Sequence, residues 1–100
     1  MKTTEGKPLP ELIPPAFILE MGYVMAHGNE TGHKKDDWKG GDPERYLGAA
    51  LRHILRYLDG EHTDPKSGRS HLAHAGSDLA IAFALDEEAT RNTRNTMCRL

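Results

Sequence analysis

The segment SGRSHLAHAGSDLA, residues 67–80, places polar side chains at helical spacing among alanines and leucines. On an α-helix, His71, His74 and Asp78 lie on one face, within roughly 60° of one another. Because a buried polar group without a hydrogen-bond partner costs about 1–3 kcal/mol, this face needs partners. The partners can be one another, another helix, a ligand or a metal ion.

The best partners in the sequence come shortly before this segment. They stand in the apolar stretch YLGAALRHILRYL and in the connection DGEHTDPKSG, and they are Arg52, His53, Arg56, Glu61 and Asp64. A connection of this length holds its two flanking helices antiparallel, so the end of one lies beside the start of the next. We therefore expect one cavity that is surrounded by Arg56, Glu61, Asp64, His71 and His74.

Three interpretations of this cluster stay open. In the first, the side chains form a hydrogen-bonded polar layer that fixes the register of the helices. In the second, histidines and carboxylates bind a divalent ion (Mg²⁺, Mn²⁺ or Zn²⁺), with Glu61, Asp64 and Asp78 as candidate ligands, although HxxH alone is a weak metal signal. In the third, arginines and protonatable histidines bind a phosphorylated ligand whose ring stacks on Trp38 or a tyrosine.

The best-defined helix that must position the cluster covers residues 43–59. Asp42 followed by Pro43 is typical of an N-cap and first helical position, and Gly60 is a left-handed stop signal. Apolar residues recur every three or four positions and predict one continuous apolar face. That face comprises Leu47, Ala50, Leu51, Ile54, Leu55 and Leu58.

Two further helices flank this one. The first follows Pro15 and continues with helical apolar spacing until Gly28, and the third begins after a Ser70 cap and runs through residues 71–89. In the third, small residues let two helices approach closely, and large ones are expected in the core. The small residues are Ala73, Ala75, Gly76 and Ala80, and the large ones are Leu72, Leu79 and Phe83.

The remaining segments are predicted to be irregular. Residues 1–14 hold three prolines and suit an extended arm, and residues 28–42 form a long Gly-rich and Trp-containing loop between the first two helices. Residues 90–100 lose the apolar period and are expected to fray or to project as a basic tail. We thus predict an all-α protein: an arm (1–14), a single domain (15–90) that is a compact three-to-four-helix bundle, and a polar tail (91–100).

Composition and charge limit the classes of protein to which the chain can belong. The chain has 100 residues, 37% of them hydrophobic, so it is one small domain whose core we expect a homo-oligomer to complete. A net charge of −2 disfavours binding to duplex nucleic acid but allows a local site for a small anion. The single cysteine, Cys98, and the lack of a signal segment or long apolar run favour a cytoplasmic protein with no membrane contact.

Four stretches, GKPLPELIPP, DDWKGG, YLGAALRHILRYLDGE and DPKSGRSHLAHAGSDLA, resemble a known family over residues 7–85. The family is the N-terminal domain of phage dATP/dGTP diphosphohydrolases. The resemblance implies an all-α, phage-encoded domain associated with hydrolysis of purine deoxynucleoside triphosphates to monophosphate and pyrophosphate. It also implies that the polar motif positions of the family are Arg52, His53, Glu61, Asp64, His71 and His74.

These observations predict a nucleotide-binding phage protein that hydrolyses or binds purine nucleoside phosphates. In a metal-dependent pyrophosphohydrolase, Glu61, Asp64 and Asp78 would hold the cation, and His71 or His74, with Glu61, would serve catalysis. The side chains that we expect to bind the ligand are Trp38, Arg52, His53, Arg56, Tyr57 and Arg69.

A second hypothesis belongs to another class of protein. A small chain with donors and aromatic rings but without the paired carboxylates of helical pyrophosphohydrolases can sequester a ligand without cutting it. The ligand would be a nucleotide-derived signal of host immunity, of the cyclic-nucleotide or ADP-ribose type, in a cavity of an oligomer. In both hypotheses the protein acts in the cytoplasm of the host cell.

Overall fold

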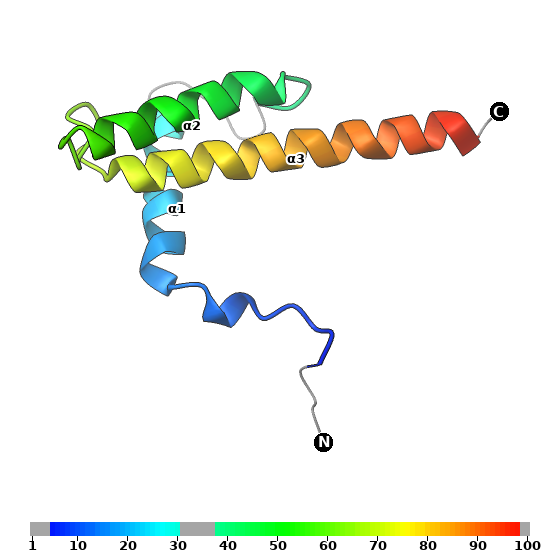
Figure 1. Cartoon of the computed structure of the whole chain (residues 1–100), viewed down its shortest axis with the longest axis horizontal. Coiled ribbons are helices and arrows are strands. Elements are labelled where there is room, and N and C mark those ends of the chain that lie inside the picture. Colours follow the sequence, from blue (N-terminus) through cyan, green and yellow to red (C-terminus); the bar gives the residue numbers. More distant parts are fainter. Residues whose placement is uncertain (1–4, 31–37, 99–100) are drawn as a thin grey trace.

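The computed structural model describes residues 5–30 and 38–98, and over these residues the chain is helical and contains no strand (Figure 1). A short 3₁₀ turn at Pro10–Leu12 precedes α1 (Pro15–Glu30), α2 (Pro43–Leu58) and α3 (His71–Cys98). The predicted all-α class is therefore confirmed. No helix in these residues is both long enough and apolar enough to cross a membrane.

The ends of α2 follow from local chemistry. The Asp42 carboxylate accepts a hydrogen bond from the backbone N–H of Glu44 at 3.0 Å, and Pro43 occupies the first turn. At the other end, Gly60 has a φ of 103°, a conformation that side chains with a Cβ rarely adopt. The helix therefore begins and ends within one residue of its predicted bounds.

The outer helices are longer than the sequence predicts. The first continues through Gly28 to Glu30, and the third continues to Cys98 instead of fraying from residue 90. The predicted tail contains no proline or glycine, and Arg91 lies 3.5 Å from Glu87 one turn earlier, an (i, i+4) pair that supports a helix. Residues 31–37 of the predicted loop lie outside the described residues.

Two contacts arrange the helices. In Figure 1, α2 lies antiparallel along the first part of α3, and α1 crosses α3. Gly76 marks the crossing, because a Cβ added there would lie 2.6 Å from Cζ of Phe17 and 2.7 Å from Sδ of Met21. The expected close approach of helices at a small residue is thus present between α1 and α3.

The buried core consists mainly of small residues. Ala50, Ala73, Ala75, Ala82 and Leu85 are buried, whereas the predicted core residues Leu72, Leu79 and Phe83 are 43%, 46% and 69% exposed. This correction has a simple cause: α2 and α1 meet α3 along its alanine and glycine positions, and the larger side chains stand beside these lines. Most of the predicted apolar face of α2 is exposed as well, at Leu47, Leu51, Leu55 and Leu58.

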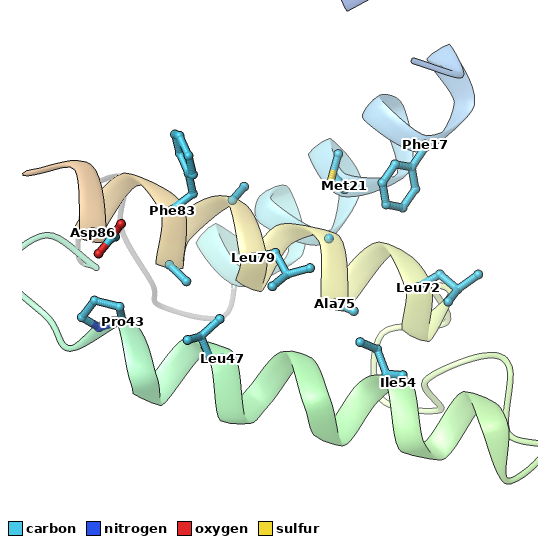
Figure 2. A pocket seen from close by; sticks show the side chains of 13 residues that line it. Phe17, Met21, Pro43, Leu47, Ile54, Leu72, Ala75, Leu79, Phe83 and Asp86 are labelled. Atoms are coloured by element: carbon cyan, nitrogen blue, oxygen red, sulfur yellow. The ribbon is translucent and has the colours of Figure 1, made fainter. Parts of the chain in front are cut away.

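Apolar side chains from all three helices border an open pocket of about 860 Å³ (Figure 2). Phe17 and Met21 reach it from α1, Leu47 and Ile54 from α2, and Leu79 from α3. Its lining is almost entirely apolar and includes none of the histidines discussed below. The polar chemistry of the domain therefore lies elsewhere, at the turn between α2 and α3.

Candidate metal and phosphate site

The connection between α2 and α3 is folded tightly around Asp64. The Asp64 N–H donates to the carbonyl of Arg69, its carbonyl accepts from the N–H of Gly68, and its Oδ1 accepts from the N–H of Lys66 at 3.0 Å. Gly68 has a φ of 72°, which closes the turn. Two of these hydrogen bonds fix the backbone of Asp64 and the third holds its carboxylate, whose Oδ2 lies 3.3 Å from Nε2 of His74.

The start of α3 is fixed in the same region. As predicted, Ser70 caps the helix: its Oγ accepts from the N–H of Leu72 at 3.1 Å. The N–H of His71 donates to the carbonyl of His62 at 2.9 Å. These bonds set the rotation of the first helical turn, so that the two histidines of the SHLAH motif contact α2.

His71 is the most deeply buried of the large side chains, with no exposed side-chain surface. Its Nε2 lies 2.7 Å from Oε1 of Glu61, and its Nδ1 lies 2.8 Å from Nδ1 of His53. Both ring nitrogens therefore have partners, and the partners are two of the residues that the sequence analysis selects.

His74 contacts the same elements from the next turn of α3. Its ring stacks on that of His53, with centroids 4.6 Å apart and an interplanar angle of 14°. Its Nε2 lies 2.6 Å from Oγ of Ser67, in addition to the Asp64 contact. His53 thus stands between the two histidines of α3, as the antiparallel arrangement predicts.

The cluster favours neutral imidazoles beside an ionised carboxylate. Burial, with the neighbouring His74 and His71, lowers the pKa of His53 to about 4. Burial also lowers the pKa of His74, which outweighs the opposing effect of Asp64. Although burial acts to raise the pKa of Asp64, the hydrogen bond from Lys66 and the facing histidines keep it below the usual value. Neutral imidazole and carboxylate are the forms that bind metal ions.

Within the described residues, one group has the composition and spacing of a metal site. It comprises His53, Asp64 and His74, whose potential ligand atoms all lie within 4.8 Å of one another. Two imidazoles and a carboxylate suit Zn²⁺, Mn²⁺ and related ions. Of the predicted metal ligands, Asp64 belongs to this group, Glu61 binds His71 instead, and Asp78 lies outside it.

The predicted ligand-binding residues fall into separate places. Arg52 and Arg56 are exposed on α2, on either side of His53 in the sequence. Arg69 donates to Glu20 at 3.3 Å and lies 4.0 Å over the ring of Tyr23, so it ties the connection to α1. The other two contact different neighbours: the ring of Tyr57 stacks on His62, and Trp38 precedes the N-terminus of α2, where its carbonyl accepts from the N–H of Gly41.

Three residues of this region are not anticipated by the sequence analysis. Ser67 contacts His74, His62 supplies a backbone carbonyl to His71, and Glu20 pairs with Arg69. A serine before glycine is a common turn signal, so the sequence could have placed Ser67 in the turn but not beside a histidine. The Glu20 contact spans 49 residues and has no local signal.

The burial of Asp78 predicts that the stability of the protein depends on pH. Burial raises its pKa to about 6, although Arg52 lowers it in part. Between pH 3.8 and 6 the folded protein holds a proton that the unfolded chain has lost, so this group's contribution to stability falls as the pH rises through that window. At pH 7.5 the Asp78→Asn variant should therefore be more stable than the parent by about 1–2 kcal/mol, after allowance for solvent screening.

Urea denaturation at pH 4 and pH 7.5 measures the effect. The gain in the free energy of unfolding of Asp78→Asn should be present at pH 7.5 and small at pH 4, where the parent carboxyl is protonated in the folded state. A variant that is no more stable than the parent at pH 7.5 would contradict the assignment. Metal affinity should be unchanged, because Asp78 lies outside the three-residue group.

Comparison with known proteins identifies similar sequences. A family model described as dATP/dGTP diphosphohydrolase, N-terminal, matches residues 1–95. A dATP/dGTP diphosphohydrolase of Salmonella phage PMBT28 is 36% identical over 85 residues, which cover 85% of this chain and 29% of the relative. The chain thus spans less than a third of the length of that curated relative. No solved structure matches it.

Proposed function

The chain belongs to the dATP/dGTP diphosphohydrolase N-terminal family, and on this premise we propose that it binds a divalent metal ion and hydrolyses purine deoxynucleoside triphosphates. The proposed ligands of the ion are His53, Asp64 and His74. The products would be a nucleoside monophosphate and pyrophosphate. The observation that carries the proposal is the convergence of these three ligand atoms within 4.8 Å at the turn between α2 and α3.

Each part of the site has a separate role in this proposal. A bound ion would neutralise phosphate charge and lower the pKa of a coordinated water. Arg52 and Arg56, exposed on the helix that holds His53, would bind the phosphate oxygens. Glu61 and His71 hydrogen-bond to each other, and His71 has no exposed surface, so we assign neither of them direct contact with substrate.

Release of pyrophosphate tests this function. The protein is incubated with dATP or dGTP and with Mn²⁺, Zn²⁺, Co²⁺ or Mg²⁺ in turn. We expect release with at least one ion, a loss of at least 100-fold in Asp64→Ala, and little change in Arg91→Ala, whose side chain pairs with Glu87 far along α3. Absence of pyrophosphate under every condition would overturn the hydrolytic role.

One observation favours a second function, sequestration without turnover. The chain matches 29% of the length of its relative, so a domain of this kind can bind a phosphate-bearing ligand while another part of a longer protein cuts it. The ligand would be a purine nucleotide or a nucleotide-derived immune signal. Calorimetry with dATP, a cyclic dinucleotide and ADP-ribose, followed by mass spectrometry of the recovered compound, separates the functions: intact ligand supports sequestration, and cleaved ligand excludes it.

A further inference from the structure

A continuous row of hydrogen-bonding groups ends at the proposed metal site and consists of Glu61, His71 and His53. Oε1 of Glu61 lies 2.7 Å from Nε2 of His71, and Nδ1 of His71 lies 2.8 Å from Nδ1 of His53. His53 in turn stacks on His74. The row therefore leads from a half-exposed carboxylate, through a completely buried ring, to a candidate ligand.

The chemistry of these groups orders the protons along the row. A carboxylate can only accept, so Nε2 of His71 carries the proton of the first bond. With that single ring proton, His71 has a lone pair on Nδ1, and His53 donates to it from its own Nδ1. The lone pair of a neutral His53 consequently lies on Nε2, the nitrogen left to bind an ion.

We infer that Glu61 and His71 are positioning residues that hold His53 in the tautomer with a lone pair on Nε2, and thereby make the site selective for nitrogen-preferring ions such as Zn²⁺ and Co²⁺ over Mg²⁺. This inference rests on the metal site of the proposed function. A carboxylate that orients a metal-binding histidine is a common outer-shell arrangement. Here the carboxylate acts through a second imidazole, that of His71, which is buried and therefore shielded from water.

The burial pattern supports such a role. Glu61 is 51% exposed and His71 is fully enclosed, so the carboxylate reaches water while the ring between it and His53 does not. Water therefore has no access to either nitrogen of His71, and the ring can exchange neither partner without movement of Glu61 or His53. The hydrogen bond from His71 to Glu61 sets the direction of both hydrogen bonds that His71 makes.

The first experiment reads the tautomers directly. Long-range ¹H–¹⁵N correlation spectra of ¹⁵N-histidine-labelled protein are recorded at pH 8, with a chelator present. We expect His71 to carry its proton on Nε2 and His53 to carry its proton on Nδ1. A proton on Nε2 of His53 would overturn the inference whether or not the protein binds a metal, so this result is separate from the fate of the proposed function.

The second experiment reads the consequence for the site. Zn²⁺ affinity is measured by competition with a chromophoric chelator, and Co²⁺ affinity by visible absorption. Glu61→Ala should weaken both affinities 10–100-fold and mix the His53 tautomers, because the acceptor is gone. Glu61→Gln, whose amide oxygen can still accept, should recover most of the affinity, and millimolar Mg²⁺ should not displace Co²⁺.

Asp59→Ala is the matched control, since it removes a neighbouring exposed carboxylate and keeps the backbone N–H that donates to the carbonyl of Leu55. It should leave both affinities and both tautomers unchanged. Equal Co²⁺ affinity in Glu61→Ala and the parent would overturn the positioning role. Displacement of Co²⁺ by Mg²⁺ would overturn the selectivity. A parent protein that binds neither Zn²⁺ nor Co²⁺ would overturn the proposed metal function together with its selectivity.

Discussion

Replacement of His74 by alanine is expected to reduce the affinity for Zn²⁺ or Co²⁺ by at least 100-fold. The change removes one of three proposed ligands, together with the ring that stacks on His53 at 4.6 Å and the partner of Asp64 and Ser67. Two remaining ligands bind a divalent ion far more weakly than three, because each ligand adds its own bond within a site that the fold has already arranged.

Titration calorimetry or cobalt absorption measures this loss. His62→Ala is the matched control, because its ring stacks on Tyr57 in the same turn and only its backbone carbonyl contacts His71. The control should bind metal as the parent does. Undiminished affinity in His74→Ala would remove His74 from the site and leave the three-residue group without support.

Replacement of His71 by alanine should give the largest loss of stability, about 3 kcal/mol. The side chain has no exposed surface, so its removal leaves a cavity, and it also deprives Glu61 and His53 of hydrogen-bond partners. A domain of this size has a free energy of unfolding of about 5–15 kcal/mol, so the midpoint of thermal unfolding should fall by more than about 10 °C.

Thermal and urea denaturation followed by circular dichroism check this prediction. The His62→Ala variant again serves as comparison and should lose less than about 1 kcal/mol, since its side chain is exposed. If the two variants lost the same stability, the buried row of Glu61, His71 and His53 would have no part in holding α2 against α3.

The parts of the fold that the sequence predicts are those with local causes. Asp42, Pro43 and Gly60 act within one turn of the helix end, and they place α2 within a residue. The short connection to Ser70 also predicts the antiparallel pair, which brings His53, His71 and His74 together. Helical spacing and loop length were sufficient for this much of the site.

The parts that escape prediction depend on contacts between distant segments. The apolar period marks Leu72, Leu79 and Phe83 as core, but periodicity shows only which residues share a face and not which element covers it. The roles of the individual residues in the polar cluster could not be predicted for the same reason. Spacing treats these three carboxylates as equivalent, whereas the structure places Asp64 in the metal group, Glu61 on His71 and Asp78 on α3 outside both.

The position of the candidate ligands along the chain has a consequence for folding. All three lie within residues 53–74: His53 on α2, His74 on α3, and Asp64 in the turn between them, which is closed by its own backbone hydrogen bonds. Few residues must be ordered to bring the ligands together, so the entropy lost on closing the loop is small and the site has a low contact order. The α2–α3 hairpin can therefore assemble its ligands early in folding, before α1 packs across Gly76.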